Sequence, residues 1–249
     1  MAKPIRTWDD YYVPGTTVLR NLYGYTDQAT LTAREEYDTA VRLAELAARP
    51  IKGRFDYAHM KAIHRHIFQD VYPWAGKERV GPVGAFMTKD GPDVVRFAPG
   101  DPDAPTTVYA YYPAGAGLRA AAEEQYARLA AKDLLRGLEH KEFVTELAEV
   151  WGELNVIHSF REGNTRTQAV FFSWLAEQAG YRIATDRMGP GMPLRDRFVA
   201  ARFYSQATGD NAHLVEVLAE AVEPISPQDR RAPRQRRTGR QTKRPGEDQ

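Results

Sequence analysis

The most constraining feature of this sequence is a stripe of apolar residues at helical spacing in its second half. Steps of three and four residues separate the members of this stripe, which are Phe143, Leu147, Val150, Trp151, Leu154 and Ile157. That period is typical of an amphipathic helix. A second apolar segment, from Thr165 to Ala179, ends at Gly180, a residue suited to the left-handed position after a helix. Two such helices joined by a short polar segment would pack their stripes together, so the sequence predicts a helical core here.

Shorter patterns predict further helices on both sides of this pair. Thr32 and Glu35 have the spacing of a capping box for a helix that ends before Pro50, and Asp56 can cap the next helix. Apolar periodicity and turn residues indicate three more helices, at about residues 118–138, from near Pro193 to Gly209, and from Asp210 or Asn211 to before Pro224. The expected fold class is therefore all-α, a mainly helical bundle.

One interval between the helices favours strands. Short β-prone runs at residues 85–88 and 94–97 flank the turn-forming segment 89–93, which contains Asp90-Gly91. This pattern predicts one β-hairpin with a loop longer than two residues. A lone hairpin is only marginally stable in water, so it is expected to lie against the helices. No repeat or linker interrupts residues 1–227, which we interpret as one domain.

Composition removes several classes of protein. The 249 residues are 43% hydrophobic and 27% charged, as in ordinary globular proteins, and include no cysteine. Disulfides, thiolate chemistry and zinc–cysteine sites are thereby excluded. No apolar run approaches the roughly 18 residues of a membrane-spanning helix, and the polar start does not resemble a secretory signal. We therefore expect no membrane partner and a cytoplasmic location.

The charge is distributed unevenly along the chain. Residues 228–249 hold eight of the 34 basic residues but three of the 33 acidic ones, which leaves 26 basic and 30 acidic residues in the rest. This segment has no large apolar side chain, so it is predicted to be a disordered basic tail. It could contact nucleic acid, or it could be a solvated tail that aids solubility.

The residue types suited to chemistry gather between the two most apolar helices, at residues 158–169. His158 falls at the end of the first helix, and the free N–H groups at the start of the second form an anion site. Arg166 adds a positive charge suited to phosphate, and Glu162 offers oxygen ligands for Mg²⁺. A histidine beside such a site can take a proton from an attacking hydroxyl. These residues favour phosphoryl or nucleotidyl transfer, although helix capping and surface ion pairs alone would also explain a polar loop.

This segment resembles the motif of the Fic family, His-x-Phe-x-(Asp/Glu)-Gly-Asn-Gly-Arg-x-x-Arg. Six of its eight fixed positions match, namely His158, Phe160, Glu162, Gly163, Asn164 and Arg166. The resemblance covers roughly residues 8–222 and implies a core at about residues 55–210. It also implies that the hairpin, at about residues 80–98, is a flap that positions the target protein.

The resemblance to Fic adenylyltransferases implies a role for each matched residue. His158 would deprotonate a Tyr, Thr or Ser hydroxyl of a target protein, which then attacks the α-phosphate of ATP. Glu162 would hold Mg²⁺, and the phosphates would be bound by Gly163, Asn164, Thr165 and Arg166. The flap residues Phe86, Met87, Thr88 and Lys89 would position the target, mainly through their backbone. Phe160 would anchor the loop from the core.

Two departures from the motif leave alternatives open. Thr165 stands where the family has Gly, and a β-branched residue would hinder a left-handed backbone there. Ala169 stands where the second arginine grips the terminal phosphates. The related Doc branch shares both departures and transfers the γ-phosphate, so a kinase is one alternative. A non-catalytic descendant that binds nucleotide or nucleic acid is another. Gly163, where Doc-type proteins have Ala, favours the adenylylating branch.

The resemblance also suggests how the protein is controlled. Family inhibitory helices carry (Ser/Thr)-x-x-x-Glu-(Gly/Asn). Thr32 with Glu36, and Thr145 with Glu149, have the spacing but lack the final Gly or Asn. We therefore expect a bacterial toxin inhibited by a separate small antitoxin, or an effector delivered to another cell. His59, His64 and His66 share one predicted helix, but their spacing does not favour a metal pair.

Overall fold

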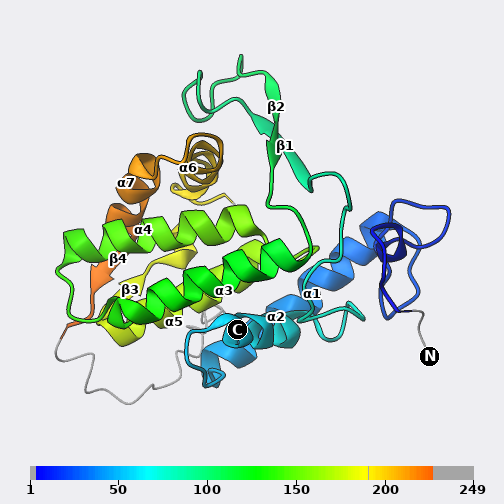
Figure 1. Cartoon of the computed structure of the whole chain (residues 1–249), viewed down its shortest axis with the longest axis horizontal. Coiled ribbons are helices and arrows are strands. Elements are labelled where there is room, and N and C mark those ends of the chain that lie inside the picture. The colour runs from blue at the N-terminus through cyan, green and yellow to red at the C-terminus, as the bar shows by residue number, and fades with distance from the viewer. Residues whose placement is uncertain (1–3, 190, 227–249) are drawn as a thin grey trace, which may run out of the picture.

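The computed structural model describes residues 4–189 and 191–226, and this part of the chain is mostly helical (Figure 1). Its α-helices are α1 (Gln28–Ala48), α2 (Tyr57–Phe68), α3 (Ala116–Ala131), α4 (His140–Ile157), α5 (Asn164–Ala179), α6 (Arg195–Thr208) and α7 (Ala212–Ala221). Short 3₁₀ turns lie at Asp9–Tyr11, Asp133–Leu135 and Thr185–Met188. The predicted helical fold class is confirmed. The predicted tail, 228–249, lies outside the described residues. Among those described, no helix has the length and apolar character needed to cross a membrane.

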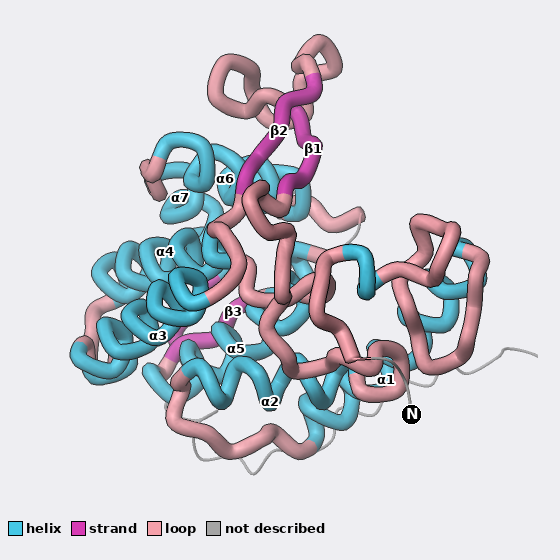
Figure 2. The backbone as a smooth tube through the Cα atoms, turned by 45° about the vertical axis from the view of Figure 1, so that its right-hand side comes forward, coloured by secondary structure: helices cyan, strands magenta, loops and turns pink. Residues whose placement is uncertain are grey.

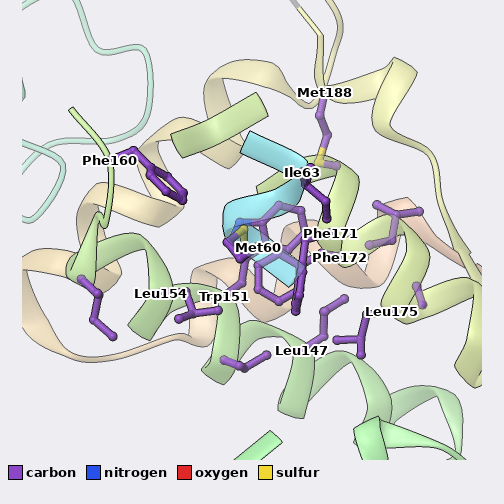
Figure 3. Packing of buried hydrophobic residues seen from close by; sticks show 14 of the residues in the cluster. Met60, Ile63, Leu147, Trp151, Leu154, Phe160, Phe171, Phe172, Leu175 and Met188 are labelled. Atoms are coloured by element: carbon purple, nitrogen blue, oxygen red, sulfur yellow. The ribbon is translucent and has the colours of Figure 1, made fainter. Parts of the chain in front are cut away.

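The helices α4 and α5 form the centre of the bundle. Helices α6 and α7 pack on α4, and α2 packs on α5 and carries α1 on its outer side. Apolar side chains from α2, α4 and α5 meet between them, as Figure 3 shows for Met60, Trp151 and Phe172. Trp151 and Phe172 stack with their ring centroids 4.4 Å apart. Close packing of buried aromatic rings makes this a rigid platform for the loop that joins α4 to α5.

The helix starts agree with the sequence at one position and differ at another. Asp56 caps α2 as expected, because its carboxylate accepts the His59 N–H at 2.9 Å. The expected capping box at Thr32 is wrong, since α1 begins four residues earlier and Asp27 caps it through the Thr30 N–H at 2.8 Å. Asp and Thr are both favourable N-cap residues, so the pattern at Thr32 was preferred to Asp27, the actual N-cap five residues earlier.

A hairpin projects from the helical body beside α6, as Figures 1 and 2 show. Its strands are β1 (Thr88–Pro92) and β2 (Thr106–Ala110), paired antiparallel with Asp90 opposite Val108. The predicted strands are both misplaced: only Thr88 of 85–88 lies in a strand, 94–97 lies in neither strand, and the hairpin spans residues 88–110 where about 80–98 was expected. The Asp93 carboxylate accepts the N–H groups of Val95 and Arg96, which makes a local turn instead of a strand. The Asp-Gly pair therefore lies within β1, and the connection runs from residue 93 to 105.

The prediction of one hairpin also missed a second small sheet. Strands β3 (Tyr181–Ile183) and β4 (Val222–Pro224) pair antiparallel. They join the end of α5 to the end of α7, with Ile183 opposite Val222. Both strands are three residues long, too short for a period-two pattern to be visible in the sequence.

Candidate active site

The chain turns sharply between α4 and α5 through two left-handed residues. His158 ends α4 with φ 49°, and Gly163 precedes α5 with φ 80°. A Cβ atom on Gly163 would lie 2.2 Å from the Phe68 ring, so glycine is required there for both space and backbone conformation. This turn brings His158 and the N-terminus of α5 to the same cavity.

Asn164 closes the loop from within. Its Oδ1 accepts the Phe160 N–H at 3.0 Å, and its Nδ2 donates to the Phe160 carbonyl at 2.8 Å. Asn164 is 3% exposed, so its side chain serves the loop, while the N–H groups in the first turn of α5 have no partner within the helix and are available to an anion. Phe160 points from the loop into the core, at the edge of the apolar cluster in Figure 3.

His64 supports the loop from below. Its Nδ1 accepts the Gly76 N–H at 2.8 Å, so the proton is on Nε2, which lies 3.0 Å from the Glu162 carbonyl. The ring stacks on Phe160 with the centroids 3.9 Å apart. The sequence drew attention to His64 only as a metal ligand, and no pattern in it indicates contact with a loop 98 residues away.

Stability should depend on pH through His64. Burial lowers its pKa from 6.5 to about 4, so the unfolded chain binds more protons between these values. The free energy of unfolding should therefore fall as pH falls from 6.5 to 4, by up to about 3 kcal/mol. Urea unfolding across this pH range should show that the free energy of unfolding falls less in H64F than in wild type. In H213Q, which alters an exposed histidine, it should fall as much as in wild type. Parallel curves for H64F and wild type would contradict the assignment.

His158 is held as a neutral imidazole. Its ring stacks on Tyr111 at 3.7 Å, and its Nδ1 lies 3.3 Å from the Asn155 carbonyl. A carbonyl only accepts, so Nδ1 carries the proton and Nε2 keeps a lone pair. Burial, together with the nearby charge of Arg202, holds the pKa of His158 well below its ordinary value. A neutral histidine can act as a base at physiological pH.

Arg79 fixes the end of α4 and was not found from the sequence. It is 2% exposed, and its guanidinium donates to the carbonyls of His158 at 2.8 Å and Gly81 at 3.0 Å, and to that of Tyr112. Because Tyr112 follows β2, Arg79 links the histidine to the base of the hairpin. An isolated arginine in a loop gives no sequence signal for such a role.

Glu162 has the chemistry expected of an Mg²⁺ ligand. Its side chain is 44% exposed, and Oε1 accepts the Gly163 N–H at 2.9 Å. No group of three or more metal-ligating side chains lies within the described residues. Mg²⁺ is commonly held by one or two carboxylates plus water and substrate phosphates, so a single exposed carboxylate beside an anion site fits this ion.

Arg166 and Thr165 contact different helices, Arg166 on the side of α1 and Thr165 on the side of α6. Arg166 forms an ion pair with Glu35 of α1, and its guanidinium lies 4.7 Å from the centre of the Phe68 ring. Thr165 lies in the first turn of α5 and is absent from the described residues with positive φ. Thr165 therefore does not have the left-handed backbone that a β-branched residue would hinder. Its hydroxyl accepts from Arg202 at 3.2 Å.

A cavity of about 320 Å³ is lined by His158 and by residues 161–166 of the motif. The motif forms its floor, and Tyr111 and residues 87–89 of the hairpin form one wall. Phe86 is absent from the lining residues and is 56% exposed. Helix α6 forms a further part of the lining, next to the hairpin, with the side chains of Arg195, Val199, Arg202, Phe203 and Gln206. The hairpin and the motif thus face the same space, as a flap over a reaction site would.

A helix start, a histidine and a strand pair around one cavity, within a helical fold, are features expected of a protein that binds phosphate ligands. Residues 54–176 match the Fic/DOC family. The chain is 37% identical over 215 residues to the probable protein adenylyltransferase y4lH of Sinorhizobium fredii, covering 86% of this chain and 96% of that protein. The chain therefore belongs to the Fic/DOC family.

Two other comparisons agree with this membership. Over 180 residues, 72% of its length, the chain is 38% identical to the protein adenylyltransferase VbhT of Bartonella schoenbuchensis. It spans 33% of the length of that relative. A crystal structure of BepC from Bartonella tribocorum with bound AMPPNP matches with a TM-score of 0.70 at 23% identity, over 88% of this chain and 98% of that one. At that identity the likeness shows the fold.

Proposed function

We propose that this protein transfers AMP from ATP to a Tyr, Thr or Ser hydroxyl of a target protein. The observation that carries the proposal is the neutral His158 in the same cavity as the free N–H groups of α5. The relatives named protein adenylyltransferase support it, since one of them matches over 86% of this chain and 96% of its own length.

The residues suit each part of this reaction. The target oxygen forms a bond to the α-phosphorus, the bond from that phosphorus to the bridging oxygen breaks, and pyrophosphate leaves. His158 Nε2 takes the hydroxyl proton. Amides at the start of α5 stabilise the charge that develops on the phosphate oxygens. Glu162 is the residue that would hold Mg²⁺, which supplies further charge neutralisation when bound.

The proposed partners follow from this chemistry. The target protein would present its hydroxyl beside residues 87–89 of the hairpin. The inhibitor, in a toxin–antitoxin arrangement, would be a separate small protein, because neither candidate segment in the chain completes the inhibitory pattern. The reaction requires ATP, which the cytoplasm of the producing bacterium, or of a cell that receives the protein, would supply.

Radiolabel transfer tests the proposal directly. The purified chain is incubated with Mg²⁺, a bacterial lysate and ATP labelled at either the α- or the γ-phosphate. Protein should acquire label from the α-phosphate and none from the γ-phosphate. Label from the γ-phosphate would make the protein a kinase, and label from neither position would contradict both activities under these conditions. Activity of the free chain is the result expected if its inhibitor is a separate protein.

A further inference from the structure

Arg202 on α6 is a buried cation that lines the cavity. It is 9% exposed. Its Nε lies 3.1 Å from Asn155 Oδ1, and its Nη2 contacts the same oxygen. Its Nη1 donates to the Thr165 hydroxyl at 3.2 Å. These partners are neutral, so they orient the guanidinium without balancing its charge.

No carboxylate forms an ion pair with Arg202 among residues 4–189 and 191–226. Two other arginines do have carboxylate partners: Arg166, which also lines the cavity, pairs with Glu35, and Arg197 of α6 pairs with Glu220. Burial lowers the pKa of Arg202 to about 10, so it is still charged at neutral pH. A buried charge without a counter-ion is costly, and its retention in a cavity is explained if a ligand brings the opposite charge.

The surroundings of Arg202 add to the positive charge. Arg195, Val199 and Arg202 share one face of α6, and Lys89 reaches the cavity from β1. The charges of Arg202 and Lys89 both lower the pKa of His158. Several cations lie close to one helix N-terminus. Such a site suits a ligand with several negative charges better than a ligand with one carboxylate.

Arg202 contacts the helix on which the motif lacks its second arginine, replaced here by Ala169. Thr165, which Arg202 contacts, and Ala169 lie four residues apart on α5 and therefore share one face of that helix. Ala169 has no donor, and the hydrogen bond from Arg202 to Thr165 places the Arg202 guanidinium at the start of α5. We propose that Arg202, assisted by Arg195, binds the β- and γ-phosphates of the nucleotide in place of the missing arginine. This inference rests on the proposed function.

Asn155 connects this clamp to the base. Its side-chain oxygen accepts from Arg202, and its backbone carbonyl accepts from His158 Nδ1. Asn155 is 2% exposed and sits in the last turn of α4. It is a positioning residue that holds the phosphate-binding cation and the base at a set separation.

Nucleotide affinities test the assignment. Isothermal titration calorimetry with AMPPNP, ADP, AMP and adenosine compares wild type with R202Q, R202K and R197Q, the last a control on the same helix outside the cavity. R202Q should weaken AMPPNP binding about 10- to 100-fold, the range for a hydrogen bond to a charged group, and change adenosine binding less than about threefold. The AMPPNP affinity of R202K should lie between those of wild type and R202Q, and the affinity of R197Q should equal that of wild type.

Each other result counts against the proposal. Unchanged AMPPNP affinity in R202Q, equal weakening for AMPPNP and adenosine, or no AMPPNP binding by wild type would overturn it. The melting temperature of R202Q should be no lower than that of wild type, because a buried charge is removed. If R202Q does not fold, R202K decides, and AMPPNP affinity equal to wild type in R202K overturns the assignment. Wild type that binds AMPPNP through Arg202 but transfers no AMP would refute the proposed function alone.

Discussion

H158A should transfer AMP about 10²- to 10⁴-fold more slowly than wild type while binding AMPPNP with similar affinity. This is the range in which general bases contribute to catalysis. The imidazole is neutral, with Nε2 unprotonated, so it can accept the proton of the attacking hydroxyl. The measurement is the initial rate of α-label transfer alongside the dissociation constant of AMPPNP.

The pH dependence and a second variant make this prediction specific. A pKa held below 6.5 leaves His158 unprotonated at neutral pH, so kcat/KM of wild type should fall on the acid side only below pH 6.5. H213A, which alters an exposed histidine of α7, should keep the wild-type rate within about twofold. If H158A retained more than a tenth of the wild-type rate, the proton would have to go elsewhere.

G163A should destabilise the protein by about 2 to 5 kcal/mol and weaken AMPPNP binding. An L residue is strained at φ 80°, and the added Cβ would meet the Phe68 ring at 2.2 Å, so the loop or α2 must move. The turn leads into the first residues of α5, which line the cavity, so its displacement would move the proposed phosphate site. Urea unfolding and calorimetry with AMPPNP measure the two effects.

Gly209 offers a matched control for this substitution. It has φ 75°, but a Cβ there would meet nothing within 4 Å. G209A should therefore cost only the backbone strain, about 1 kcal/mol. F68L combined with G163A should recover part of the lost stability, because it removes the contact. Equal effects of G163A and G209A would show that Phe68 does not constrain the turn.

The helices and the motif could be predicted from sequence because their signals are local. The stripe from Phe143 to Ile157 lies within α4, and Asp56 caps α2 through a residue three positions away. The hairpin register depended instead on Val94 and Tyr109, which pack with Phe203 of α6. A contact with a helix about a hundred residues later cannot be seen in a short window.

The candidate site divides in the same way. His158, Glu162 and Gly163 follow one another along the chain, so a motif identifies them. His64, Arg79 and Arg202 approach the loop from α2, from the segment before β1 and from α6. Their residue types are common, and only the fold reveals their partners. Asn164 belongs to the motif, but the part its side chain plays in closing the loop is visible only in the structure.

The base of the hairpin is not free to swing. Tyr109 stacks on Phe203 with centroids 4.3 Å apart, and Gln206 Nε2 donates to the Ala110 carbonyl at 2.7 Å. The strands are therefore bound to the same helix that carries Arg202, and Arg79 connects Tyr112, two residues after β2, to His158. An incoming polypeptide would thus meet a strand whose separation from the reacting groups is already set. Selection among targets would then depend on which chains carry a hydroxyl at the right distance along an extended segment.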